Sequence, residues 1–162
     1  MTSPENFMIS STLEPLKTSR SLWVLMLASL GIYTFILAYS LSQGRVPDNS
    51  TLTYQIVSSL GLLFFLAGIF LPKLLIRKLR KDKPELFIPV DPKESISKEL
   101  TELVVPPHIL RLAFFEATAL TGFILGYITI NIENFYPCLI LSLAGLLYNF
   151  PAQRVYRRML GI

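Results

Sequence analysis

One carboxylate, Glu116, lies inside a continuous apolar segment formed by residues 109–130. At about 1.5 Å per residue, this segment is long enough for a helix to cross a hydrocarbon core of about 30 Å. Carboxylates inside membrane helices are energetically costly and often belong to proton or ion pathways. Two interpretations stay open. Glu116 is either a protonated side chain that hydrogen-bonds a neighbouring helix, which we favour, or a carboxylate that gains and loses a proton during transport.

Asn149 and Tyr148 are the predicted partners of Glu116. Glu116 lies near the basic end of its apolar segment, and Tyr148 and Asn149 lie near the basic end of the last apolar segment. If these two segments form antiparallel helices, the three side chains come to nearly the same depth. A phenol and an amide can both hydrogen-bond a protonated carboxyl group.

Other chemistry lacks the residues it would need. The chain has one cysteine, Cys138, and one histidine, His108, which are too few for a zinc, haem or iron–sulfur site. No nucleophile–base pair, phosphate-binding loop or metal-ligand spacing is visible. We therefore expect no enzymatic activity, no cofactor and no metal. His108 and Arg111 precede Glu116 and are interpreted as interfacial, with Arg111 reaching toward water.

Composition assigns the chain to the membrane proteins. Of its 162 residues, 52% are hydrophobic and only 16% are charged, which is unusual for a soluble domain. The net charge is +4, but the basic residues lie at the ends of apolar segments and are not interleaved with aromatic residues. We interpret them as topology signals and contacts for anionic lipid head groups, and we expect no binding to nucleic acid.

Four apolar segments predict an all-α membrane protein with four transmembrane helices arranged as two hairpins. Residues 1–20 form a polar tail with no predicted fold, and residues 21–81 form the first hairpin. A cytoplasmic loop, residues 82–108, leads to a second hairpin with a basic end, residues 109–162. The last span is predicted over residues 135–150, after a tight loop at residues 131–134.

The cytoplasmic loop contains the signature of a short amphipathic helix. Asp91 is a good N-cap, Pro92 fits the first helical position and Glu94 follows at N3. Apolar residues then recur on one face between residues 96 and 104. This helix is predicted to end before Pro106 and Pro107.

Small residues define a helix-packing face in the third apolar segment. Ala119, Gly122 and Gly126 share one side of the predicted helix, where another backbone can approach closely. Aligning residues 35–39 with residues 123–127 places Ala28 and Gly31 of the first apolar segment on an equivalent stripe. A tandem duplication of a helical hairpin explains this similarity. Shared lipid-facing composition explains it equally well.

Residues 112–123, LAFFEATALTGF, are similar to the carboxylate-bearing helix of the rotary-ATPase proteolipid c subunits. That resemblance implies proton or ion coupling at Glu116. In the family, however, the carboxylate lies on the second helix of a hairpin near the bilayer centre, and the helices are rich in glycine. Here Glu116 lies on a first helix, and the whole chain has only 8 glycines. The chain is therefore not assigned to that family.

The basic clusters predict the orientation. They fall on one side of the four-span arrangement, so the positive-inside rule places both termini in the cytoplasm, and we expect the bacterial cell (inner) membrane. The predicted function is that of a non-enzymatic accessory, assembly or interaction subunit, whose partner is a membrane protein or a second copy of this chain. The alternative is a proton- or ion-coupled transport component that uses Glu116.

Overall fold

The structure is a computed structural model that describes residues 4–44, 51–84 and 98–160. These residues are almost entirely helical and contain no strand, which confirms the all-α prediction. The elements in chain order are α1 (Pro4–Ser42), α2 (Thr51–Asp82), α3 (Lys98–Thr129), the 3₁₀ turn η2 (Ile132–Asn134), α4 (Tyr136–Tyr148) and α5 (Gln153–Leu160).

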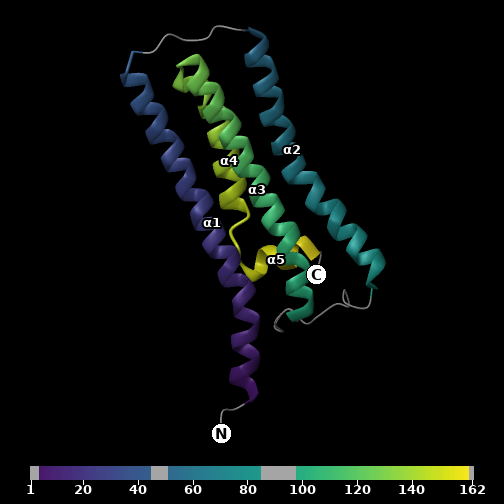
Figure 1. The fold of residues 1–162 in the computed structure, drawn as a ribbon. Coiled ribbons are helices and arrows are strands. Elements are labelled where there is room, and N and C mark those ends of the chain that lie inside the picture. Colours follow the sequence, from purple (N-terminus) through teal and green to yellow (C-terminus); the bar gives the residue numbers. More distant parts are fainter. Residues whose placement is uncertain (1–3, 45–50, 85–97, 161–162) are drawn as a thin grey trace.

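Helix α3 is the centre of the bundle. It lies between α1 and α2 and also packs along α4, whereas α5 lies across the bundle toward one end (Figure 1). The same end holds the N-terminal part of α1, the C-terminal part of α2 and the start of α3 (Figure 1). These parts of the chain carry most of the basic residues, so we call this the basic end.

Three helices are long and apolar enough to cross a membrane. The qualifying segments are Lys17–Ser42, Leu52–Asp82 and Glu102–Thr129. Only 11% of the most apolar part of α1 is buried inside the molecule, against 50% of that of α3. The large apolar side chains that α1 and α2 leave exposed are those expected on helices that face lipid. The chain is thus a membrane protein by length and composition.

The predicted fourth span is shorter than the other three. Helix α4 has 13 residues, about 20 Å of helix, so it does not cross a hydrocarbon core of about 30 Å by itself. It ends where the sequence dictates, because Phe150 precedes Pro151 and the residue before a proline disfavours helical backbone. Asn149 has left the helical conformation, with φ −105° and ψ 30°.

The polar tail predicted to lack a fold is helical in the structure from Pro4. Helix α1 has 39 residues and runs without interruption into the first apolar segment. Proline fits the first turn of a helix, where its missing N–H has no partner in any case. A helix already formed by the apolar segment extends easily, because adding a residue costs far less than nucleating a new helix.

The predicted break at Pro106 and Pro107 is absent, which corrects the sequence analysis. Helix α3 runs from Lys98 through both prolines to Thr129. A proline inside a helix costs about 3 kcal/mol, but here the segment is packed on both sides of the pair: Val104, Pro107 and His108 are buried. Tertiary packing therefore outweighs the local preference. The predicted helix start at Asp91 lies outside the described residues.

The connection between α3 and α4 is tight, as predicted. Ile130 adopts a left-handed conformation with φ 48°, and the backbone N–H of Asn131 donates to the carbonyl oxygen of Gly126. The side chain of Asn131 then accepts from the backbone N–H of Glu133 at 2.9 Å and caps η2. This turn sets α4 directly against α3.

The two halves of the chain do not match closely. Helix α2 has 32 residues, whereas α4, its counterpart in a duplicated hairpin, has 13. Their first helices also pack differently, because the small residues of α1 face outward while those of α3 face inward. The main core lies where α1, α3 and α4 meet, and its buried members are Leu30, Leu112, Phe115, Ala119 and Leu146.

Candidate functional site

Glu116 lies on α3 and faces α1, not α4. The hydroxyl of Tyr33 donates to Glu116 Oε1 across 3.4 Å, and both side chains are half-buried. This distance is long for an O–H···O hydrogen bond, so the contact is weak. The Tyr33 ring also stacks on Phe123, with ring centroids 5.3 Å apart. Glu116 thus meets one phenol from α1 and not the predicted phenol and amide near the end of α4.

The two predicted partners of Glu116 are engaged elsewhere, which corrects the sequence analysis. Asn149 Oδ1 accepts a hydrogen bond from Arg111 Nη1 at 3.0 Å. Tyr148 is 65% exposed, and the guanidinium of Arg158 lies 4.8 Å from its ring centroid. The register of α3 against α4 also differs from the prediction, because Phe115 lies against Gly145 and Arg111 against Asn149, so Asn149 is level with Arg111 rather than with Glu116.

The side chain of Arg111 points in a different direction from the one predicted. Instead of reaching toward water, it turns into the protein and bonds Asn149, which is only 3% exposed. Asn149 in turn donates through Nδ2 to the carbonyl oxygen of Gly145 at 2.7 Å. Arg111 Nε is buried without a hydrogen-bond partner in the described part of the chain.

His108 is also buried, at 0% exposure, although it was expected at the interface. Its ring packs edge-on against Tyr156 of α5, with centroids 5.0 Å apart, and neither ring nitrogen has a hydrogen-bond partner among the described residues. Burial raises the pKa of Tyr156, and the neighbouring Ser19 hydroxyl and Arg20 charge offset part of that rise. These contacts hold α5 against α3 and α1. Among the described residues, no group of His, Cys, Asp and Glu could hold a metal ion.

The small residues of α3 lie at its contact with α4 and α1. A Cβ added at Gly122 would collide with the Cβ of Cys138 on α4. At Gly126, an added Cβ would be 2.9 Å from a methyl group of Leu37 on α1 and 3.1 Å from Phe135 Cβ. Ala119 is fully buried in the core.

The small residues of α1 lie in a different setting. Ala28 and Gly31 are exposed, and an added Cβ at Gly31 would have no atom within 4 Å. Helix α1 instead packs against the bundle through its other side, where Leu30 and Leu37 are buried. The stripe predicted from the sequence is therefore on the outer surface of this chain.

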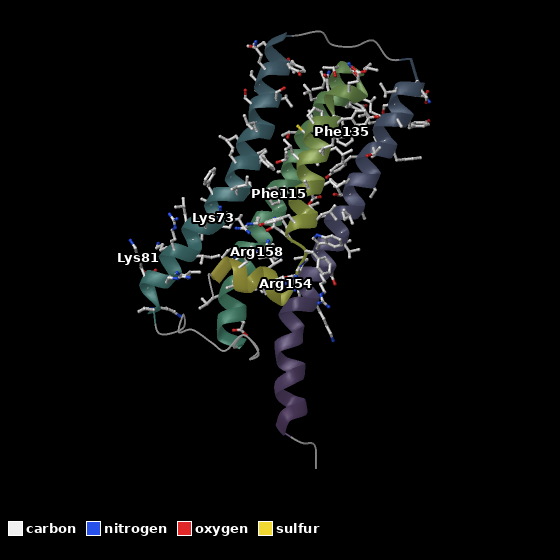
Figure 2. The ribbon with its side chains drawn as sticks, turned by 180° about the vertical axis from the view of Figure 1, so that it is seen from behind. Lys73, Lys81, Phe115, Phe135, Arg154 and Arg158 are labelled. Carbon is white, nitrogen blue, oxygen red and sulfur yellow. The ribbon has the colours of Figure 1, made fainter. Side chains whose placement is uncertain are left out.

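A cavity lies at the basic end, between α2, α3, α4 and α5, and we call it the basic cavity. Its volume is about 830 Å³, within the range of about 300–1,000 Å³ that is usual for small-molecule sites. Figure 2 shows Lys73 of α2 and Arg158 of α5 on the same side of Phe115, with Lys81 farther along α2. The charged lining residues are Lys73, Arg77, Arg80, Arg111 and Arg158.

The other half of the basic cavity is apolar. The ring of Phe115 lies against Gly145, where an added Cβ would be 2.6 Å from a ring atom, so glycine is needed for this approach. Phe65 packs beside Phe115, with ring centroids 5.7 Å apart. The apolar lining residues used below are Phe65, Ile69, Phe115, Leu141 and Ala144.

The sequence analysis missed the basic cavity because its cations come from three separate helices. One signal was present in α2 alone, where Phe65, Ile69, Lys73, Arg77 and Arg80 recur at helical spacing and therefore share a face. Nothing in the spacing of the chain indicated that Arg111 and Arg158 join that face.

No protein-family model, curated protein or solved structure matches this chain.

Proposed function

We propose that this chain is a non-enzymatic integral membrane protein that acts by associating with a second membrane-embedded protein chain through the outer face of α1. The outer face of α1 is defined by Ala28, Gly31 and Phe35. The proposed setting is a bacterial inner membrane, with both termini in the cytoplasm.

The observation that supports this function is the open space at Gly31. Membrane helices associate where small residues let their backbones approach, because lipid tails offer no hydrophobic driving force between helices. On α3 the small residues Gly122 and Gly126 serve such contacts within the chain. On α1 they face outward, on the helix with the smallest buried share among the three long helices. A second helix seated there would make a contact similar to that of α3 with α4.

The orientation is supported by the charges. Basic residues of α2, α3 and α5 gather at one end, whereas the turn between α3 and α4 at the other end carries Glu133. The positive-inside rule then puts the basic end in the cytoplasm. In this arrangement α4 and residues 149–152 make the fourth crossing together, since about 20 Å of helix and four further residues span a hydrocarbon core of about 30 Å.

A second candidate function, proton- or ion-coupled transport, is supported by the weak contact of Glu116. Its carboxyl group is half-buried, and the 3.4 Å contact with Tyr33 is the one hydrogen bond that the structure gives it. A carboxyl group held this loosely can gain and lose a proton without breaking an ion pair. We rank this function second, because its support is this one weak contact.

Cross-linking in native membranes tests the association. In a Cys138→Ala background, Ala28→Cys should form a disulfide-linked dimer if the partner is a second copy. If the partner is a different chain, a photoreactive residue at position 28 should give one discrete adduct. In either case Gly31→Leu should remove most of the product, because its side chain blocks close approach.

The matched control is the same probe at Leu63, which is 61% exposed on α2. Ile36→Leu, on the exposed side of α1, serves as a second control because it adds no volume. The proposal fails if position 28 gives no product, or if its product is unchanged by Gly31→Leu and also forms from position 63.

A further inference from the structure

The basic cavity combines two chemically different halves in a fixed order. Along α2 its lining changes from Phe65 and Ile69 to Lys73, Arg77 and Arg80 over about 22 Å of helix. Phe115 of the apolar half lies toward the middle of the bundle, and Lys73 and Arg158 of the charged half lie nearer the basic end (Figure 2). A phospholipid has the same order, with an acyl chain followed by a phosphate.

The charged half has an excess of positive charge. Five cations line the cavity, and its lining contains no carboxylate. Like charges gathered at a partly enclosed surface repel one another and favour binding of an anion. Arginine also binds phosphate through paired N–H donors, and the buried Nε of Arg111 has no hydrogen-bond partner among the described residues.

The apolar half argues for a lipid rather than a free anion. Phosphate alone would leave the surface around Phe65, Ile69 and Leu141 without a partner. Helix α2 packs closely on α3 but touches α4 little, so the cavity is bounded by α2 and α4 without being closed between them. Both helices expose apolar side chains to their surroundings. An acyl chain can enter the cavity from the bilayer along this route.

We propose that the basic cavity binds one anionic phospholipid, with its phosphate at the charged half and an acyl chain along the apolar half. Basic pockets between transmembrane helices at the cytoplasmic side are a recognised setting for such head groups. The cation–π contact between Arg158 and Tyr148 helps to position one of the cations, since their groups lie 4.8 Å apart. This site goes beyond the proposed function, because it needs no partner protein.

Native mass spectrometry of the full chain in detergent measures the binding. We expect phosphatidylglycerol to bind at a single saturable site, about tenfold or more tightly than phosphatidylcholine with the same acyl chains, since the zwitterionic head group adds a cation beside those of the cavity. The double variant Lys73→Gln/Arg77→Gln should weaken phosphatidylglycerol about 30-fold, because each cation near an anionic head group contributes about a factor of five.

The matched control is Lys78→Gln/Lys81→Gln. It removes the same charge from the same helix, but neither residue lines the cavity. This control should leave the affinity for phosphatidylglycerol unchanged. Equal losses in the two double variants would show general attraction to a basic surface and would overturn the proposal.

Ala144→Phe tests the apolar half without changing any charge. Ala144 is exposed to the cavity, so the larger ring fills the space proposed for the acyl chain. It should weaken phosphatidylglycerol but not the binding of inorganic phosphate. If inorganic phosphate competes fully and Ala144→Phe leaves lipid affinity unchanged, the site binds free phosphate and the lipid proposal is wrong. Thermal unfolding without lipid verifies that each variant is folded. If Lys73→Gln/Arg77→Gln does not fold, the single variant Lys73→Gln takes its place.

Discussion

The indole Nε1 of Trp23 donates a hydrogen bond of 2.8 Å to the carbonyl oxygen of Leu146. This bond joins α1 to the last turn of α4, where backbone carbonyls lose their helical partners. A little farther on, Arg20 Nε donates to the carbonyl oxygen of Pro151 at 3.3 Å. Non-helical backbone at membrane depth is tolerated only where protein satisfies it. Side chains of α1 therefore make the early end of α4 possible.

Trp23→Phe should destabilise the chain by about 1–3 kcal/mol, because it strands the buried carbonyl of Leu146 while keeping an aromatic ring at the site. The ring contact with Phe150, now edge-on at 5.0 Å, can persist in this variant. Unfolding in mixed detergent micelles, followed by circular dichroism, measures the change. Val24→Ala, at an exposed position next in the sequence, is the control and should have little effect. An unfolding curve for Trp23→Phe that overlays the parent curve would show that the hydrogen bond does not hold α4.

Two glycines in helix interiors should respond oppositely to the same substitution. Gly122→Ala forces a Cβ into Cys138 on α4 and should destabilise the chain by about 1–3 kcal/mol, as overpacking does. Gly31→Ala meets no atom and should be neutral or stabilising by up to about 1 kcal/mol, because alanine favours the helix. Unfolding of the monomeric chain in detergent decides the sign of each change. Destabilisation by both variants, or by neither, would contradict the packing described here.

Helices were the most predictable part of this fold. Apolar length and composition predicted four spans, and the structure has three helices long and apolar enough to cross a membrane. Asn131 with its polar neighbours indicated the tight turn before α4. The predicted helix end before Pro106 was wrong because packing outweighs the local preference of proline to end a helix. The burial of Val104 and His108, which shows this packing, cannot be inferred from the sequence of residues 98–108 alone. At Pro151 the local preference holds: α4 ends before this proline, and no tertiary contact restores the helix.

The candidate sites were less predictable, since they depend on how helices rotate about their own axes. The sequence placed Glu116, Tyr148 and Asn149 at similar depth but did not reveal that Tyr33 on α1 is the neighbour of Glu116. Close packing at residues such as Gly122 and Gly145 determines which face of each helix points toward its neighbour. This packing is visible only in the three-dimensional structure.

Arg111 and Asn149 should behave as a coupled pair. Asn149→Leu removes the acceptor of Arg111 Nη1 and leaves a partly buried guanidinium without that partner. The double variant Arg111→Met/Asn149→Leu should therefore be more stable than Asn149→Leu alone, with a coupling energy of about 0.5–3 kcal/mol. Detergent unfolding of both single variants and the double variant gives this energy. Rescue of Asn149→Leu by Glu116→Leu instead would support the pairing predicted from the sequence and contradict the structure.

Cysteine labelling in intact cells should separate the two ends of the bundle. In a Cys138→Ala background, Glu133→Cys in the α3–α4 turn should react with an impermeant maleimide, whereas Lys83→Cys and Arg154→Cys should react only after the membrane is permeabilised. All three positions are exposed in the structure, so access depends on the side of the membrane. External labelling at position 83 would reverse the orientation. External labelling at position 154 alone would remove the fourth crossing.

Glu116 distinguishes the two candidate functions. Its contact with Tyr33 is long, and hydrogen bonds between membrane helices average about 0.6 kcal/mol with a maximum of about 1.7 kcal/mol. Tyr33→Phe and Glu116→Gln should therefore each cost less than about 2 kcal/mol, and a double-mutant cycle should give a coupling energy below about 1 kcal/mol.

The functional test of Glu116 compares Glu116→Gln with Glu116→Leu. If Glu116 is structural, Glu116→Gln keeps a neutral polar group, so both the protein abundance and the association through the outer face of α1 should be unchanged. If the carboxylate carries protons or ions, Gln should abolish function as completely as Leu while the α1 cross-link stays intact, because Gln cannot release a proton at any accessible pH. The cellular phenotype, the protein level and the position 28 cross-link are measured in the same Gln and Leu variants. A loss of phenotype while the protein level and the cross-link are unchanged would support the transport function and contradict the association function.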